Sequence, residues 1–490
     1  MAGRQEKRHV GLVRRCPKLN DGPAVEGRER RTAQRQTCGH RVAFHAAPEP
    51  ACPAPTRALV ERWRVACYLN GSATLASPFA MIPLLKGLRI LDLTSVILGP
   101  YATQILGDLG AEVIKVEPPE GDSMRPVAPV AAPGISAIFA NNNRNKRSVV
   151  LDLKSTAGRA ALFKLLPTAD AIVHNMRQDA MDKLGLTFTA VRAVSPKIIY
   201  AAAVGFGRHG RYAGKPAYDD VIQAASGFAG LFEMRDGTPL YAPTIAADKV
   251  SGLHLAYALL AALLYRERSG ESPGYIEVPM FELMAAFSLS EHLGAATFAE
   301  DGNVGYARVL SRGRRPYRTK DGWIGVLPYT ERNWTKVLRE IGRAETCEQP
   351  WFRNATERSR RVDDLYDLLA AALPSRSSAE WLALFKELDI PCQPVRKPGD
   401  LLADPHLADV GFFAPNFAHA TPVTRTLRQA VNVEALPVEP DLPPPALGAD
   451  TAEVLRLTGC SEAEIASCTA ARRPAAEAGP RDRASGLGGG

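Results

Sequence analysis

The sequence of 490 residues lacks the patterns that mark several common protein classes. Its eight cysteines form no CxxC pair, so no zinc spacing is present, and a disulfide framework is unusual in so long a chain. The most apolar run, Leu253 to Tyr265, has 13 residues, which is too short to span a bilayer. We therefore expect reduced thiols, a cytoplasmic location, no metal and no membrane segment.

Basic residues are in excess only at the start of the chain. Residues 1–80 contain 14 Lys and Arg against 6 Asp and Glu, whereas the remainder contains 46 of each, so the net charge of +8 lies in the first segment. That segment is rich in proline and has almost no apolar periodicity, a composition that does not fold alone. We predict a disordered leader or a mis-called start over 1–80, an ordered chain from Met81, and a disordered tail over 469–490. The balanced remainder argues against a nucleic-acid partner.

From Leu85 onward, short apolar strands alternate with helical patterns. Strands are predicted at 89–93, 111–117, 148–153, 171–174 and 198–203, and helices at 101–109, 155–166 and 221–226. This alternation predicts an α/β fold with a parallel sheet that binds ligands at the carboxyl ends of its strands. The turn at Val96 to Pro100 lacks Gly-x-Gly-x-x-Gly, which argues against NAD or FAD. Residues 227–237, with glycine at both ends, read as a loop.

One basic stretch precedes the predicted strand at 148–153. Residues 141–148 contain Arg144, Lys146 and Arg147 among four asparagines. The residues alone leave two interpretations open. Either this is a solvated loop, or the three cations bind a ligand that carries several phosphates.

A single aspartate stands at the start of the longest apolar helix pattern. In the segment 246–254, Asp248 comes just before the apolar residues. An aspartate at a helix start is usually an N-cap, worth about 1 kcal/mol. Held in place and partly desolvated, it is instead a nucleophile for an activated acyl group such as a thioester. Its position alone leaves both roles open.

Residues 85 to about 460 resemble the family III CoA-transferases of the formyl-CoA transferase and carnitine CoA-transferase type, also called the CaiB/BaiF family. The matching stretches occur in family order at 85–92, 99–102, 109–117, 145–148, 218–227 and 248–254. The resemblance implies that Asp248 attacks an acyl-CoA, giving a mixed anhydride and then an aspartyl-CoA thioester, and that a free carboxylic acid accepts the CoA. Coenzyme A and acyl-CoA are then substrates, with no tightly bound cofactor, and the basic stretch gains a phosphate-bearing ligand.

The resemblance also implies a CoA site. Its positions are Ile97, Leu98, Leu151, Asp152, Leu153, Lys154, Asn175, Met176, Lys183, Lys215, Pro216, Ala217 and Tyr218. Three positions depart from the formyl-CoA transferase pattern: Pro118 replaces an arginine near the adenine, Met176 an aromatic residue, and Lys183 an arginine that reaches a phosphate. The absence of a glycine run between Glu300 and Pro316 argues against formyl or oxalyl transfer.

Two other functions stay open. In α-methylacyl-CoA racemases a histidine at the position of Tyr218 pairs with the aspartate to move an α-proton. A phenol, whose pKa is ordinarily near 10, is a poor base at neutral pH, so transfer is favoured over racemisation. A non-catalytic CoA-binding protein is the third possibility. The sequence does not identify the acyl donor or the acceptor acid.

The resemblance implies a two-domain chain. We expect a Rossmann-like parallel-sheet large domain over 81–297, a smaller α+β domain over 298–398, and a return to the large domain over 399–468. In the smaller domain a hairpin turns at Asp321–Gly322, helices are predicted at 334–341, 361–373 and 379–388, and a strand at 390–395. Family members form interlocked dimers, so we expect a homodimer with the active site between the domains of two chains.

Overall fold

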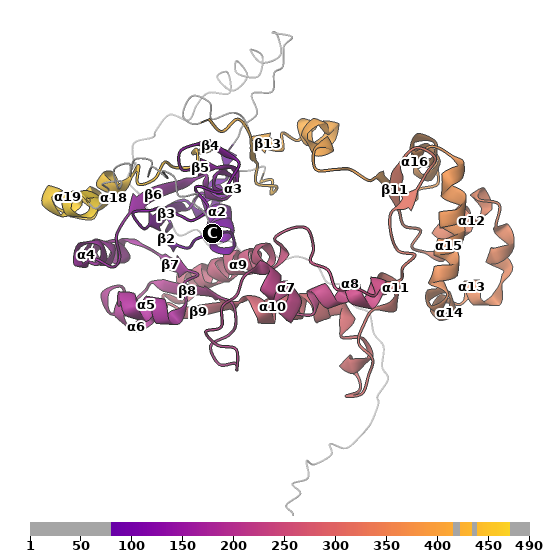
Figure 1. Cartoon of the computed structure of the whole chain (residues 1–490), viewed down its shortest axis with the longest axis horizontal. Coiled ribbons are helices and arrows are strands. Elements are labelled where there is room, and N and C mark those ends of the chain that lie inside the picture. The colour runs from indigo at the N-terminus through magenta and orange to yellow at the C-terminus, as the bar shows by residue number, and fades with distance from the viewer. Residues whose placement is uncertain (1–79, 415–421, 434–438, 471–490) are drawn as a thin grey trace, which may run out of the picture. The chain divides into compact units, whose positions relative to one another are not determined.

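The computed structural model describes residues 80–414, 422–433 and 439–470 (Figure 1). The predicted leader, apart from Ala80, lies outside the described residues. The predicted tail lies outside them too, apart from its first two residues.

A sheet of six parallel strands forms the centre of the predicted large domain. Its strands are β2 (Arg89–Leu93), β3 (Glu112–Glu117), β6 (Lys146–Val150), β7 (Ala171–His174), β8 (Ile199–Val204) and β9 (Tyr275–Pro279), in the order β6-β3-β2-β7-β8-β9. This confirms the predicted α/β fold with a Rossmann-like parallel sheet. The strand order reverses between β2 and β7, and in such sheets ligands bind in the crevice beyond the carboxyl ends at that point.

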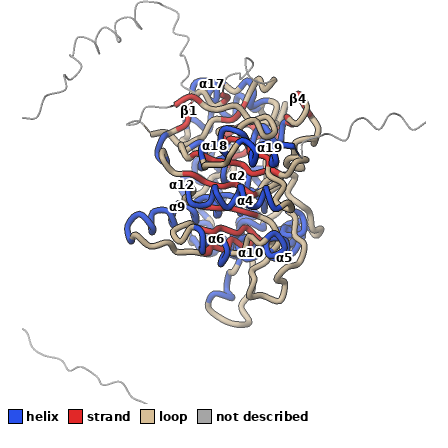
Figure 2. Tube along the Cα trace, turned by 90° about the vertical axis from the view of Figure 1, so that its left-hand side faces the viewer, coloured by secondary structure: helices blue, strands red, loops and turns tan. Residues whose placement is uncertain are grey.

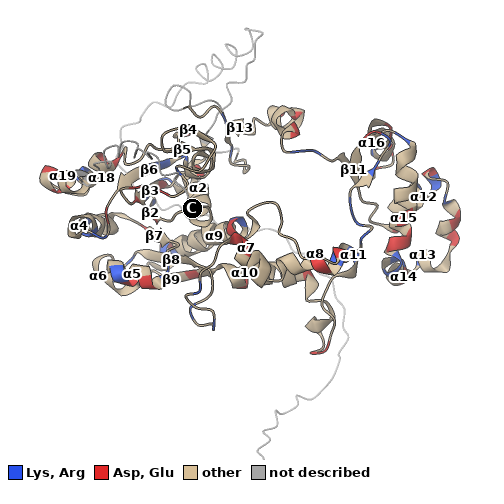
Figure 3. Cartoon of the chain, viewed as in Figure 1, with Lys and Arg blue, Asp and Glu red and all other residues tan. Residues whose placement is uncertain are grey.

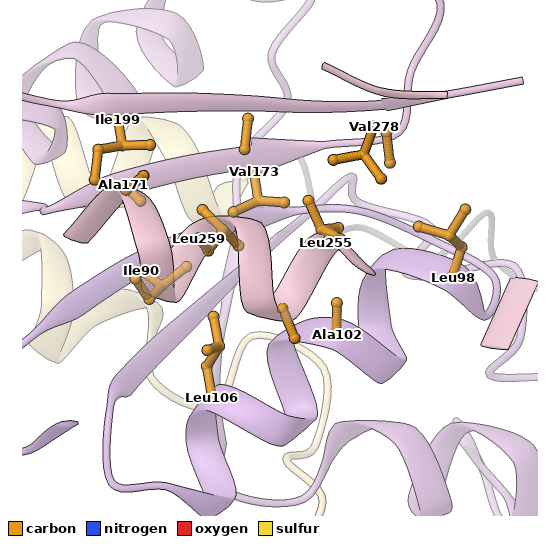
Figure 4. Packing of buried hydrophobic residues seen from close by; sticks show 14 of the residues in the cluster. Ile90, Leu98, Ala102, Leu106, Ala171, Val173, Ile199, Leu255, Leu259 and Val278 are labelled. Atoms are coloured by element: carbon orange, nitrogen blue, oxygen red, sulfur yellow. The ribbon is translucent and has the colours of Figure 1, made fainter. Parts of the chain in front are cut away.

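Helices cover both faces of the sheet (Figure 2). On one face, α2 (Leu98–Asp108) and α9 (Ala246–Ser269) pack against Ile90, Val173 and Ile199 (Figure 4). The helices on the other face are α4 (Thr156–Leu165), α5 (Gln178–Leu184), α6 (Phe188–Val194), α18 (Thr451–Leu457) and α19 (Glu462–Ala470). The central strands are therefore buried on both sides, which explains why β7 and β8 read as nearly continuous apolar runs.

The long helix α9 buries one face and exposes the other. Its buried residues recur every three to four positions from Ala247 to Leu263, as a helix that packs on one side requires. Among the described residues, it is the one helix long and apolar enough to cross a membrane. Half of its most apolar 18-residue stretch is buried inside the protein. Leu253, Tyr257 and Leu264 on its outer side are about half exposed.

The predicted loop at 227–237 is wrong, because these residues form helix α8 (Phe228–Asp236). Gly227 and Gly237 have positive φ angles of 81° and 86° and flank the helix instead of interrupting it. Both glycines supply the left-handed conformation at which a helix is entered or ended.

A third apolar core lies within residues 298–398. The antiparallel strands β10 (Tyr317–Arg318), β11 (Trp323–Val326) and β12 (Cys392–Pro394) form a small sheet, with Asp321 and Gly322 in the predicted turn. The larger helices of this segment are α12 (Glu331–Glu340), α15 (Val362–Ala372) and α16 (Ser378–Glu387), close to the predicted ranges. Trp334, Tyr366 and Trp381 are fully buried in this core.

The end of the chain contacts strands made much earlier in the sequence. Strand β15 (Glu439–Pro440) pairs with β1 (Ala80–Met81) in antiparallel fashion. The carboxylate of Asp450 accepts the N–H of Ser148 at 2.9 Å, and the hydroxyl of Thr451 accepts the N–H of Val150 at 3.0 Å. These bonds hold the α18–α19 segment to strand β6.

The remaining elements connect or flank these layers. They are η1 (Pro83–Leu85), β4 (Val130–Ala132), β5 (Ile135–Ser136), α3 (Ala137–Asn143), η2 (Leu166–Thr168), α7 (Asp219–Ala225), α10 (Met280–His292), η3 (Gly294–Thr297), α11 (Ala307–Leu310), η4 (Ala344–Glu348), α13 (Pro350–Arg353), α14 (Ala355–Arg360), η5 (Leu373–Ser375), η6 (Asp400–Ala403), α17 (Pro405–Asp409), β13 (Phe413–Ala414) and β14 (Thr426–Leu427).

Candidate active site

Two cavities adjoin at the carboxyl edge of the sheet. The first, the Asp248 cavity, has a volume of about 450 Å³ and is lined by Asp248, by loops that follow β2, β7 and β8, and by residues of β9. The second, the Pro118 cavity, measures about 460 Å³ and is lined by loops that follow β2, β3 and β6. Ser95 and Met176 line both. The cavities therefore form one ligand groove across the point where the strand order reverses.

Asp248 lies at the amino terminus of helix α2. It is the third residue of α9 and only 9% exposed, and the backbone N–H of Leu98, the first residue of α2, donates to its carboxylate. The N-cap of α9 is Ile245, so the expected capping role for Asp248 is not what the structure shows. Its side chain instead faces a cavity and the positive end of another helix, a setting that stabilises negative charge.

Gly252 explains why Asp248 reaches this place. One turn beyond Asp248, a β-carbon on Gly252 would stand 2.8 Å from the carbonyl oxygen of Leu98 and 3.0 Å from Cδ1 of Tyr101. Only glycine therefore lets α9 approach the first turn of α2 so closely. The spacing of Asp248 and Gly252 in the sequence thus encodes a contact between two helices.

Asp219 controls both the position and the charge of Asp248. Its Oδ1 accepts the backbone N–H of Asp248 at 3.0 Å, and its Oδ2 accepts Nε2 of Gln223 at 2.6 Å. Burial, and next the like charge of Asp219, raise the pKa of Asp248 to about 6, against the lowering effect of the Leu98 N–H. A carboxylate with this pKa is more basic than usual and is still about nine-tenths ionised at pH 7.

The loop between β2 and α2 is strained and firmly held. Val96, a β-branched residue, has a φ of +70°, a conformation that costs about 1–3 kcal/mol. Asn175 donates to the carbonyl of Ser95 at 2.8 Å and accepts its N–H at 3.0 Å, while Nζ of Lys115 donates to the carbonyl of Thr94 at 2.9 Å. These bonds fix the backbone that carries Leu98 to the carboxylate of Asp248.

The phosphate-binding interpretation of the basic stretch 141–148 is wrong, and so is the solvated-loop alternative. Lys146 is fully buried, and its Nζ donates to Asp92 at 3.1 Å and to the carbonyl of Pro100 at 2.9 Å. Arg144 pairs with Asp108, and Arg147 pairs with Glu112, Asp450 and Glu453. The three cations are thus neutralised by carboxylates of the fold, and none of them lines either cavity.

Most of the predicted CoA positions come together in the two cavities. Leu98, Asn175, Met176, Lys215, Ala217 and Tyr218 line the Asp248 cavity, and Leu151, Asp152, Leu153, Lys154 and Met176 line the Pro118 cavity. Three predicted positions line neither cavity: Ile97 is buried below the loop, Pro216 lies between two lining residues, and Lys183 points to solvent with Asp179 at 3.8 Å. Pro118, where the family pattern has an arginine, lines the cavity to which it gives its name.

Sequence reasoning missed two arginines of the Asp248 cavity. Arg177 directly follows the predicted contacts Asn175 and Met176, and Arg208 lies in the loop between β8 and α7, where basic residues are visible in Figure 3. The rule that ligands bind beyond the carboxyl ends of strands would have indicated both. Glu277 and Tyr275 of β9 also line the cavity, but this edge strand was not predicted at all.

Proton-transfer and metal groups are scarce here. Tyr218 is 71% exposed and lines the same cavity as Asp248, and no histidine lines either cavity in the part of the chain that the structure describes. Among residues 80–414, 422–433 and 439–470, no three His, Cys, Asp or Glu side chains cluster as metal ligands would. The groove therefore offers the buried carboxylate of Asp248, backbone N–H groups and several cations, whereas the buried carboxylates of Glu117 and Asp122 are paired with Arg125 and Lys115.

Comparison with known proteins points to one family. The family described as CoA-transferase family III matches residues 85–451. Over 318 residues the chain is 34% identical to a probable fatty acyl-CoA transferase, Rv3272, from Mycobacterium tuberculosis, covering 62% of this chain and 80% of that protein. A crystal structure of Rv3272 superposes with a TM-score of 0.67 at 29% identity, over 76% of this chain and 99% of that one.

Two further relatives are similar over nearly their whole length. A succinate–glutarate CoA-transferase from Agrobacterium fabrum is 28% identical, covering 76% of this chain and 95% of that protein. A formyl-CoA:oxalate CoA-transferase from Escherichia coli is 30% identical, covering 78% of this chain and 97% of the relative.

Proposed function

The chain belongs to family III of the CoA-transferases and is an enzyme of that class, and we propose that it moves CoA from an acyl-CoA thioester to a free carboxylic acid through intermediates bound to Asp248. The observation that carries this proposal is the place of the Asp248 carboxylate. It is buried, its pKa is raised to about 6, and it stands against the amino terminus of α2 in a cavity that adjoins the one lined by the predicted CoA residues.

The first half-reaction exchanges one acyl partner of CoA for Asp248. A carboxylate oxygen of Asp248 attacks the thioester carbonyl, and the carbon–sulfur bond breaks. CoA leaves as a thiolate, and a mixed anhydride of Asp248 and the donor acid remains. The thiolate then attacks Cγ of Asp248, which releases the donor acid as a carboxylate and leaves an aspartyl-CoA thioester. No proton is transferred, which agrees with a cavity that lacks a histidine base among the described residues.

The second half-reaction reverses these steps with a new acid. The acceptor carboxylate attacks Cγ of the aspartyl thioester and expels the CoA thiolate. The thiolate attacks the acceptor carbonyl, which forms the new acyl-CoA and regenerates the carboxylate of Asp248. The N–H of Leu98, which contacts the resting carboxylate, is the available donor for the oxygen that gains charge in the two steps that attack Cγ.

We assign the nucleotide end of CoA to the Pro118 cavity and the thiol end to the Asp248 cavity. Lys154 is an exposed cation in the first, and Arg177 and Lys215 are exposed cations in the second. No carboxylate pairs with Arg177 or Lys215 among the described residues, so both stay available to an anionic ligand. Lys183 lies outside both cavities and is the weakest of the proposed contacts.

We further propose a homodimer in the cytoplasm. Half-exposed apolar residues line the outer side of α9, and Phe287 and Leu289 of α10 are similarly exposed, a surface that a second chain would cover. Light scattering at twice the mass of one chain supports the dimer, and a single-chain mass contradicts it.

Trapping of the covalent intermediate tests the function. Incubation with acyl-CoA and hydroxylamine, followed by peptide mass spectrometry, should convert Asp248 to a hydroxamate, and Asp248→Asn should abolish both the adduct and the exchange of CoA between labelled acids. Exchange by Asp248→Asn at the rate of the natural chain would refute the assignment. Deuterium uptake from solvent at the α-carbon without CoA exchange would support the racemase alternative instead.

A further inference from the structure

Part of the Asp248 cavity is lined by residues that are not among the proposed CoA contacts. The cavity extends to Val204, Gly205, Phe206 and Arg208, at and after the end of β8, and to Tyr275 and Glu277 of β9. The proposed CoA contacts lie instead on the loops after β2, β6 and β7, on α5, and at 215–218. Since β9 is the edge strand on the side away from β6 and β3, the β8–β9 part lies across the groove from the nucleotide end.

Arg208 is the cation that the fold holds in this part of the cavity, beside the carboxylate of Glu277. Its guanidinium lies 4.3 Å from the centre of the Tyr275 ring, and its Nε is 3.7 Å from Oε2 of Glu277 and 3.2 Å from Nε2 of His209. Its backbone N–H donates to Oε1 of Glu277 at 3.0 Å. Nε takes part in two of these contacts, and the side chain is 55% exposed, so the guanidinium is accessible to a ligand.

The loop that carries Arg208 is fixed as well. The N–H of Gly207 donates to Oε1 of Glu282 at 2.9 Å, and a β-carbon on Gly205 would stand 2.2 Å from Cβ of Ala217. An arginine set by a carboxylate, an aromatic ring and a packed loop loses little freedom when it binds a planar anion through two hydrogen bonds.

The chemistry at Asp248 decides which anion matches. A monocarboxylic acid uses its only carboxylate at Asp248 and leaves Arg208 with its contacts in the protein alone. A dicarboxylic acid brings a second carboxylate, and Phe206, Ala213 and Met280 offer apolar surface in the same cavity for the carbon chain between the two.

We propose that Arg208 binds the distal carboxylate of a dicarboxylic substrate, so that the enzyme transfers CoA between α,ω-dicarboxylic acids. The assignment rests on the proposed function and identifies its substrate class. The other anion with the same chemistry is a phosphate of CoA, and the experiment separates the two.

The test compares glutarate with valerate, which has the same chain length but one carboxylate, as acceptors from one acyl-CoA. The natural chain should favour glutarate. Arg208→Gln should lower the ratio of kcat/KM for glutarate over valerate about 10- to 100-fold, the effect of losing a charged bidentate pair. Arg208→Lys should fall between, because it keeps the charge without the planar fork. Thermal unfolding of each variant shows that it is folded.

Arg211→Gln is the matched control, because Arg211 lies in the same loop but does not line the cavity. An unchanged ratio of kcat/KM for glutarate over valerate in Arg208→Gln, or no preference for glutarate in the natural chain, overturns the inference. CoA exchange with valerate would still support the proposed transferase function. In a third outcome, Arg208→Gln loses kcat/KM equally for both acids and its KM for acyl-CoA rises, but the rise disappears with 3′-dephospho-acyl-CoA. That result places a CoA phosphate on Arg208 and also overturns the inference. A natural chain that exchanges CoA with no acid refutes the proposed function itself.

Discussion

Replacement of Gly252 by alanine changes the distance between α9 and α2 beside Asp248. The new β-carbon would stand 2.8 Å from the carbonyl oxygen of Leu98. Because carbon and oxygen normally approach to about 3.3 Å or more, the two helices must separate by roughly half an ångström. This displacement moves Asp248 relative to the N–H of Leu98, which is its contact in α2.

Two effects on stability nearly cancel, whereas the effect on catalysis does not. Alanine favours a helix over glycine by about 1 kcal/mol, and overpacking costs about 1–3 kcal/mol. The free energy of unfolding should therefore fall by at most about 2 kcal/mol. A misplacement of 1 Å lowers rates about 100-fold, so half that shift should lower kcat about 10-fold. KM for acyl-CoA should change little, because most proposed CoA contacts lie on the sheet edge.

The assay is steady-state CoA exchange combined with hydroxylamine trapping, and urea unfolding reports stability. Gly230→Ala in α8 is the matched control, since a β-carbon there meets no atom within 4 Å. It should gain helix stability and leave kcat unchanged. A Gly252→Ala variant with the kcat and trapping rate of the natural chain would refute the reasoning that this close helix contact positions Asp248.

Three further predictions concern charge. Asp219→Asn keeps an acceptor for the N–H of Asp248 but removes a like charge beside its carboxylate. The acid limb of the pH profile of kcat/KM, expected near pH 6, should therefore move to lower pH. An acid limb at the same pH as in the natural chain contradicts this. The pKa of Asp248 rises from 3.8 to about 6 on folding, so its ionised form destabilises the folded protein. Asp248→Asn should therefore raise the free energy of unfolding, measured with urea, by up to about 3 kcal/mol at pH 8. Below about pH 4 the substitution should not raise it. Lys146→Met leaves Asp92 without one of its buried partners and should cost about 3–5 kcal/mol in the same measurement, partly restored by adding Asp92→Asn; a loss below 1 kcal/mol contradicts it.

Local patterns were sufficient for much of the fold. Strands β2 and β7 have the predicted bounds, because short apolar runs between turn residues depend on nearby sequence. The prediction for residues 227–237 failed since glycine marks the ends of helices as well as loops. Strand β9 follows the long helix and mixes tyrosine and glutamate with apolar residues, so no continuous apolar run indicated it.

The charged groups show where sequence reasoning stops. Lys146 is read as exposed until its partner Asp92, 54 residues earlier, is brought beside it by the sheet. Asp248 and Leu98 are farther apart in sequence, and they meet because Gly252 allows α9 to pack on α2. The resemblance to a family supplied the candidate nucleophile, but the partners of each charge came from the three-dimensional arrangement.

The chain's last helices have a consequence for its synthesis. Leu455 and Ile465 complete a core with Leu162 and Leu165 of α4, about 300 residues upstream. At 5–20 residues per second, a ribosome needs roughly 15–60 s to make the intervening chain. During that time the apolar side of α4 has no cover from α18 and α19, while residues 298–398 emerge with a core of their own. This apolar side of α4 therefore waits for the last helices of the chain before it is covered.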